Sequence, residues 1–158
     1  MKNNIARALL VSATASALTV AAIPAHAGSC SLANTAGDWA YTYTGTIFTK
    51  NGPVPAAAVG HFHQDAAGNI SGSQTRSVAG SSGMEDISGT ISVNSDCTAT
   101  ATINVLVDGQ LQRTGVLTGI YDNNRNHARD IFESLTLSDG TNVPVVLTSD
   151  VQRLFPRD

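Results

Sequence analysis

The residues of this chain that could bind or transform a ligand are a few charged side chains set within apolar segments. Glu133 has the same two-residue spacing as three apolar residues, Ile131, Leu135 and Leu137. Since the side chains of a strand alternate between its two faces, we expect Glu133 to point inward with them. Arg129 and His127 continue this spacing toward one end. A carboxylate inside a protein can orient a polar ligand or act as a general base.

Two arginines and two tyrosines have a similar spacing. Arg76 and Arg113 each alternate with apolar or uncharged residues, so both guanidinium groups are expected to point inward. Tyr41 and Tyr43 share one face of an alternating segment. We therefore predict a ligand site formed by Tyr41, Tyr43, Arg76, Arg113 and Glu133. The alternative is that the charged groups pair with one another or lie in water at the ends of the structure.

Other candidate sites are weaker. His61 and His63 lie on one side of a predicted strand, but no glutamate follows to complete a metal site, so no metal is expected. Glu85 and Asp86 are expected to be solvated, because the remaining oxygens of a calcium site are missing. The chain lacks a Gly-x-Ser-x-Gly motif and a phosphate-binding glycine loop. No cofactor is expected.

The first 27 residues have the pattern of a secretory signal peptide. Lys2 and Arg7 precede an apolar run, residues 8–23, and Ala25-His26-Ala27 provides a small-x-small cleavage site. The run is interrupted by serines and threonines and is shorter than the roughly 20 residues of a membrane-spanning helix. We therefore expect a secreted or periplasmic protein with one domain, residues 28–158.

If the protein is exported, its two cysteines are expected to have a structural role. In an oxidising compartment, Cys30 and Cys97 are expected to form a disulfide. A lipid anchor on Cys30 is the alternative, but Ala27-Gly28-Ser29 lacks the large aliphatic residue of a lipobox. A catalytic thiol is disfavoured because a disulfide partner would cancel its nucleophilicity.

The charge balance excludes some partners. Removal of residues 1–27 leaves seven basic and twelve acidic residues, a formal charge of −5. There is no basic run to contact phosphates and no basic amphipathic helix, so nucleic acid and a membrane surface are not expected as partners.

From Asp38 onward, alternating segments are separated by short turn signals, of which Asp108-Gly109 is typical of a tight hairpin. The predicted strands are residues 38–47, 57–64, 70–78, 84–93, 98–107, 111–121, 127–137 and 143–155. No convincing helix remains. The short connections make neighbouring strands antiparallel.

The expected fold is therefore all-β, an antiparallel up-and-down barrel of about eight strands. Closure removes the exposed edges of a long sheet, and eight strands leave room for packed side chains or one small ligand. A two-sheet sandwich is the alternative, but it usually needs longer connections.

Gly37-Asp38-Trp39 at the start of the first strand resembles the Gly-x-Trp signature of calycins, the lipocalin, fatty-acid-binding and avidin-like barrels. The resemblance implies that Trp39 closes one end of the barrel and that Arg153, from the last strand, packs over it. The Thr-Asp-Tyr signature and C-terminal helix of lipocalins are missing, as is the aromatic box of avidins. Barrels of the allene-oxide-cyclase or dirigent type are similar in architecture.

Three functions follow from this fold. The first is binding of a small, partly apolar molecule. The second is a structural or surface-interaction role for a barrel that is packed solid. The third is a cofactor-free cyclase or isomerase in which Glu133 or Tyr43 transfers a proton.

Overall fold

The computed structural model describes residues 29–155, so the predicted signal peptide lies outside the described residues. It confirms the all-β prediction: eight antiparallel strands form a closed up-and-down barrel. The elements in chain order are α1 (Leu32–Thr35), β1 (Gly37–Thr49), β2 (Gly52–Gln64), β3 (Asn69–Val78), β4 (Ser81–Val93), β5 (Thr98–Val107), β6 (Gln110–Tyr121), β7 (His127–Leu137) and β8 (Val145–Arg153).

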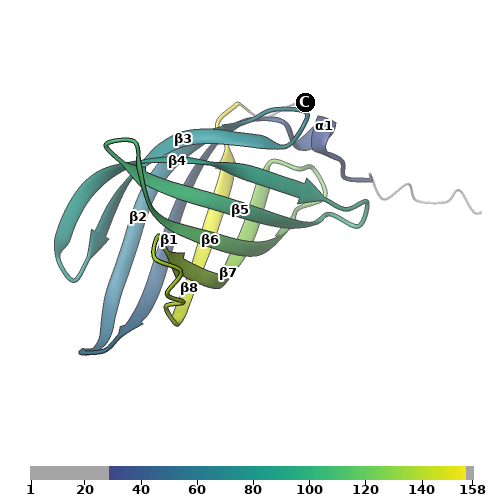
Figure 1. Ribbon diagram of the computed structural model, residues 1–158. Helices are drawn as coiled ribbons and strands as arrows, with labels where there is room; N and C mark the ends of the chain where they lie inside the picture. Colours follow the sequence, from purple (N-terminus) through teal and green to yellow (C-terminus); the bar gives the residue numbers. More distant parts are fainter. Residues whose placement is uncertain (1–28, 156–158) are drawn as a thin grey trace, which may run out of the picture.

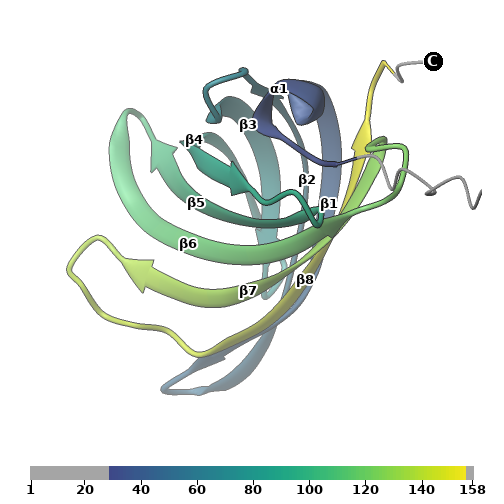
Figure 2. The same ribbon diagram turned by 90° about the vertical axis from the view of Figure 1, so that its right-hand side faces the viewer.

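Each strand pairs with the next in sequence, and β1 pairs with β8 to close the ring (Figure 1). The β5–β6 connection is a tight hairpin, in which Asp108 and Gly109 have φ values of 50° and 74°. Such paired positive φ values match the right-handed twist of the flanking strands. The up-and-down order places the hairpin tips after β1, β3, β5 and β7 at one end, called here the open end. The opposite end, which carries α1, is called the closed end (Figure 2).

The hairpin of β1 and β2 extends beyond the rest of the open end, and β2 begins five residues earlier than predicted. Two prolines, Pro53 and Pro55, weaken the sequence signal for a strand. The ladder from β2 to β3 begins only at Ala56, so both prolines pair with β1 alone. Proline is tolerated at such a free edge because it needs no ladder hydrogen bond there.

The one-turn helix α1 was not predicted from the sequence. Its N-cap is Ser31, whose side chain accepts a hydrogen bond from the Asn34 backbone, while the Asn34 side chain accepts one from the Ser31 backbone. This reciprocal capping stabilises a turn that is too short for a periodic hydrophobic pattern.

A β-bulge in β7 changes which of its residues face inward. Val116 pairs with Ser134 while Leu117 pairs with Phe132, so Glu133 is the extra residue. The inward-facing residues therefore switch at Glu133. Glu133 is exposed on the outer face, where Thr118 donates a hydrogen bond to it, and Ile131 is 50% exposed. The prediction that Glu133 points into the barrel is wrong.

Candidate ligand-binding cavity

Trp39 and Arg153 meet at the closed end of the barrel. The Trp39 side chain is completely buried, and its indole N–H donates to the Thr35 carbonyl at 3.1 Å. The guanidinium carbon of Arg153 lies 4.5 Å from the indole centroid, and Nη1 donates to the Ala36 carbonyl at 2.8 Å. A Cβ at Gly37 would overlap the guanidinium, which is the physical reason for glycine in the Gly-x-Trp motif. This is the contact that the calycin resemblance implied.

A second layer of contacts surrounds Trp39. Phe62 stacks at 6.4 Å and Tyr121 lies tilted at 5.6 Å between ring centroids. Gln64 is completely buried, donates to the Thr35 hydroxyl at 2.9 Å and accepts from the Tyr121 hydroxyl at 3.3 Å. The buried polar side chains around Trp39, those of Thr35, Gln64 and Tyr121, are therefore hydrogen-bonded to one another within an apolar cluster.

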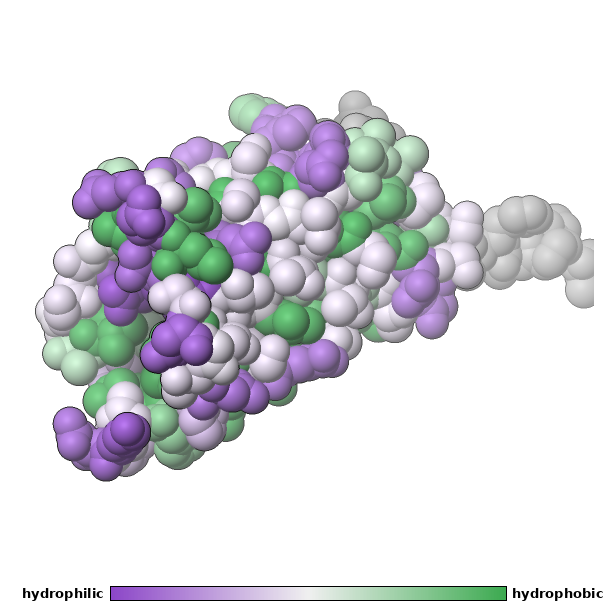
Figure 3. Space-filling model, in the orientation of Figure 1, coloured by the Kyte–Doolittle hydropathy of each residue, from purple (hydrophilic) through white to green (hydrophobic). Residues whose placement is uncertain are grey.

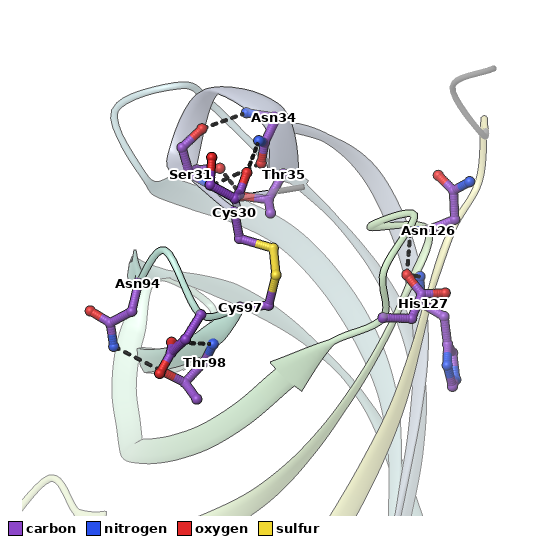
Figure 4. The surroundings of a disulfide bond; sticks show 12 residues. Cys30, Ser31, Asn34, Thr35, Asn94, Cys97, Thr98, Asn126 and His127 are labelled. Carbon is purple, nitrogen blue, oxygen red and sulfur yellow. Dashed lines mark hydrogen bonds between the residues drawn. A yellow bond between two sulfur atoms is a disulfide. The ribbon is translucent and has the colours of Figure 1, made fainter. Parts of the chain in front are cut away.

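The predicted disulfide between Cys30 and Cys97 is confirmed and joins the segment before α1 to the turn between β4 and β5 (Figure 4). The Cys30 backbone N–H also donates to the Ser95 carbonyl at 3.3 Å. The covalent link fixes α1 against the barrel, so the closed end is held by both packing and a crosslink.

Above this closed end, the barrel encloses a cavity of about 430 Å³. The alternative considered from the sequence, a barrel packed solid with side chains, would leave no such cavity. The walls are mostly apolar and come from all eight strands; they include Ile87, Ala101, Ile103, Leu117, Phe132 and Leu147. In the space-filling view, hydrophobic surface is visible at the open end between more hydrophilic hairpin tips (Figure 3). Such a cavity matches the size and character of small-molecule sites.

Glu85 organises a polar cluster on one wall of the cavity. Its side chain accepts hydrogen bonds from Arg76 Nε at 2.8 Å, from both terminal nitrogens of Arg113 at 2.9 and 2.5 Å, and from Gln74 Nε2 at 2.7 Å. Glu85 is only 3% exposed, so the prediction that it is solvated is wrong. The cluster contains two guanidinium groups and one carboxylate and therefore has an excess positive charge.

The charges of this cluster are strongly stabilised. Burial alone would raise the pKa of Glu85, but the hydrogen bonds and charge of Arg113, with the bonds from Gln74 and Arg76, hold it below the usual value. Glu85 is thus ionised at neutral pH. Since one carboxylate faces two guanidinium groups, the cluster can still attract an acceptor or anionic group of a ligand.

The two tyrosines lie beside the cluster, as the sequence spacing predicts. The Tyr41 hydroxyl donates to Gln74 Oε1 at 2.8 Å. The ring of Tyr43 is nearly buried and packs edge-to-face on Phe132 at 5.6 Å. Burial is the main cause that raises the pKa of both phenols. They are therefore protonated at neutral pH and suited to donate hydrogen bonds, not to act as bases.

A carboxylate that sequence reasoning missed lines the cavity. Asp130 precedes the bulge and faces inward with Ala128 and Phe132. Its Oδ2 accepts a hydrogen bond from the Ser149 hydroxyl at 2.8 Å. Burial, the largest cause, raises the pKa of Asp130 to about 6. The bulge misled the prediction, because the run from Ile131 to Leu137 suggested the opposite face.

The remaining charged candidates lie outside the cavity. His63 pairs with Asp38 at 2.8 Å, and His127 pairs with Asp150 at 2.9 Å, all on the outer face or rim. The Arg129 side chain is 77% exposed, so its predicted inward position, like that of His127, is wrong. Within residues 29–155, no group of three or more histidine, cysteine or acidic side chains could hold a metal ion.

No protein-family model and no curated protein sequence matches this chain. Among solved structures, it is similar to a redesigned β-barrel, mFAP1, bound to DFHBI, with 19% identity, a TM-score of 0.50 and coverage of 78% of this chain and 98% of that one. It is also similar to EF1p2_mFAP2b bound to DFHBI, with 13% identity, a TM-score of 0.53 and coverage of 80% and 98%. These likenesses support the eight-stranded barrel fold.

None of the helices in residues 29–155 has the length and apolar character that a membrane span requires.

Proposed function

We propose that this protein is a secreted or periplasmic carrier or receptor that binds one small, partly apolar molecule inside its barrel. The observation that carries the proposal is the cavity of about 430 Å³, sealed at the Trp39 end and carrying a charged cluster on an otherwise apolar wall. A barrel with a purely structural role would be expected to fill this volume with side chains, because unfilled space costs stability.

The cavity has an apolar region and a polar region, which would contact two different parts of the ligand. The apolar walls and the ring of Tyr41, whose hydroxyl already donates to Gln74, would cover its hydrophobic body, while Arg76, Arg113 and Tyr43 would bind a hydrogen-bond acceptor or an anionic group. Arg76 keeps 30% of its side chain exposed despite its bond to Glu85. Glu133 has no part in this proposal, because it lies on the outer face.

The extracytoplasmic location is part of the proposal. Residues 1–27 would act as a cleaved signal peptide, leaving one domain from residue 28 to residue 158. The Cys30–Cys97 disulfide supports this location, because disulfides persist in oxidising compartments.

The two solved barrels that resemble this one are described as bound to DFHBI. They support the proposal because a barrel of similar architecture can bind a small molecule. They do not identify the ligand of this chain.

The proposal is tested with the neutral fluorescent probe N-phenyl-1-naphthylamine and two variants of β5. Ala101→Phe places a ring in the cavity, whereas Thr102→Phe places the same ring on the outer face one residue later. We expect the wild type and Thr102→Phe to bind one probe per chain. Ala101→Phe should lose at least about tenfold in affinity, because the ring occupies the probe's volume.

Circular dichroism of both variants serves as the folding control. If Ala101→Phe is folded and binds the probe as well as the wild type does, the cavity is not the binding site and the proposal is wrong.

A further inference from the structure

Asp130 has an unusual environment for an ionisable group in an apolar barrel. The wall around it contributes one short hydrogen bond, from Ser149, although a carboxylate can accept about four. Among the described residues, no lysine, arginine or histidine forms an ion pair with it, and the charge that acts on its pKa is another carboxylate, that of Asp150. The barrel therefore keeps a carboxylate on its cavity wall without supplying a counter-ion.

The neighbouring strand is built to accommodate this carboxyl group. Gly119 of β6 lies directly opposite Asp130 in the ladder. A Cβ at Gly119 would overlap Asp130 Oδ1, so any larger residue would force the carboxyl group to move. On the other side, Ser149 of β8 is also the direct partner of Asp130 and orients Oδ2. Its two neighbours thus fix the position of the carboxyl group.

Three aromatic rings, those of Phe132, Tyr43 and Tyr121, line the same cavity as Asp130. Phe132 follows on the inward face of β7 and packs against Tyr43. Tyr43 pairs with Ser149, which pairs with Asp130, so Tyr43 lies two strands away at roughly 10 Å between backbones. Tyr121 lines the cavity toward its closed end. Burial is the largest cause that raises the pKa of Tyr121, and the charge of Asp130 is the second.

We infer that Asp130 and Ser149 form a second polar subsite, which receives a protonated amine of the ligand. This inference rests on the proposed binding function and extends it, since it assigns a cationic nitrogen to the bound molecule. A carboxylate with aromatic neighbours is the combination that recognises ammonium groups. The ammonium group supplies the counter-charge that the wall around Asp130 lacks.

A metal ion fits this subsite less well than an amine does. One carboxylate and one hydroxyl provide too few oxygen ligands for calcium or magnesium, which take six or more. An ammonium group needs only a few acceptors and an apolar surround for its carbon skeleton. The cavity supplies both, with the Glu85 cluster on the wall near Tyr43 left for an acceptor or anionic group at the other end of the ligand.

The test compares dansylcadaverine, which carries a free amine, with its N-acetyl derivative, which has the same fluorophore without the charge. The wild type should bind the amine about ten- to a hundredfold more tightly than the acetylated probe, as expected for a hydrogen bond to a charged group. Asp130→Asn should remove this preference and leave the affinity for the acetylated probe within about twofold, because the side-chain volume and the Ser149 contact are preserved.

Glu133→Gln is the matched control, because it removes a carboxylate from the outer face of the same strand and should leave both affinities unchanged. Retained binding of the acetylated probe shows that Asp130→Asn is folded. If the wild type binds both probes equally, or if Asp130→Asn keeps the preference, the amine subsite is wrong while the binding function stands. If neither probe nor N-phenyl-1-naphthylamine binds the wild type, the binding function itself fails.

Discussion

The closed end and the middle of this barrel satisfy their polar groups in opposite ways. At the closed end, Trp39, Gln64 and Thr35 are the largest fully buried side chains, and each takes part in a hydrogen bond. In the middle, Asp130 lines an open cavity with one hydrogen bond and no cationic partner among the described residues. The closed end is thus packed and hydrogen-bonded, whereas the middle keeps a cavity that, on the proposed function, holds a small molecule.

This difference has an energetic meaning. A saturated, packed region loses stability when a side chain is removed, because it leaves a void and unsatisfied groups. A cavity wall with a buried charge can gain stability when the charge is removed, and what it loses is affinity. The sign of the change in unfolding free energy therefore distinguishes the unpaired carboxylate of the cavity wall, Asp130, from the packed side chains of the closed end.

The largest loss is expected from Trp39→Ala. It should lower the free energy of unfolding by about 4 to 5 kcal/mol, since it empties a fully buried site and removes the ring under Arg153. Phe132→Ala, on the cavity wall, should cost about 2 kcal/mol, because the space around that ring is already partly empty. Urea unfolding measures both. Equal losses would contradict the contrast between the two regions.

Loss of the disulfide comes next. The double variant Cys30→Ser with Cys97→Ser should lose about 4 kcal/mol, because the link closes a loop of 67 residues in the unfolded chain. Under native conditions its affinity for N-phenyl-1-naphthylamine should match that of the wild type, because neither cysteine lines the cavity. A folded double variant that no longer binds the probe would show that the closed end also shapes the cavity.

Glu85→Gln is expected to cost about 3 to 4 kcal/mol, because it leaves Arg76 and Arg113 close together with no carboxylate between them. Glu133→Gln is the matched surface variant and should change stability by less than about 0.5 kcal/mol. Thermal or urea unfolding at neutral pH compares the pair. If the two variants were equally stable, the Glu85 cluster would not be holding the cavity wall.

Asp130→Asn should raise the free energy of unfolding, whereas the preceding variants lower it. The pKa of Asp130 is raised from 3.8 to about 6, mainly by burial, so the contribution of this group to the stability of the wild type is greatest below pH 3.8 and is lost as pH rises through about 6. The variant should therefore be about 2 to 3 kcal/mol more stable than the wild type near pH 8, and about equal to it near pH 3.5. Unfolding curves at the two pH values measure the difference.

Neighbouring charges define the control for this titration. Asp150 of β8 contributes to the raised pKa, Tyr121 faces Asp130 from the closed end, and Arg129 points outward. Asp150→Asn should therefore reduce the pH dependence only slightly, since burial is the larger cause. A stability gain of Asp130→Asn that is the same at both pH values would mean that the carboxylate does not titrate as described.

The strands were predictable from the sequence because two-residue alternation and short turns define an antiparallel order. Seven of the eight strands begin within three residues of their predicted starts. The exception is β2, because the two prolines in its first part weaken the sequence signal for a strand. The partnership of Trp39 and Arg153 came from a resemblance and not from spacing, because sequence periodicity carries no information on which strand ends meet.

The polar residues of the site were only partly predictable. Arg76, Arg113, Tyr41 and Tyr43 line the cavity as their spacing indicated. Glu133 was predicted to face the cavity, but Asp130 faces it instead. One bulge residue reverses the faces of a strand and leaves no signal in the alternation of the sequence. Glu85 was missed because apolar residues are usually buried and charged residues usually exposed. Here the reverse holds, since Met84 is 76% exposed and the neighbouring Glu85 is buried.

The central claim, that the barrel holds a small molecule, is tested most directly by native mass spectrometry of the protein purified gently from its natural host. The account predicts a noncovalent complex with one small molecule per chain, released on denaturation and carrying an amine as well as an apolar body. A protein that is bare in this measurement, and that also fails to bind N-phenyl-1-naphthylamine, would contradict the account.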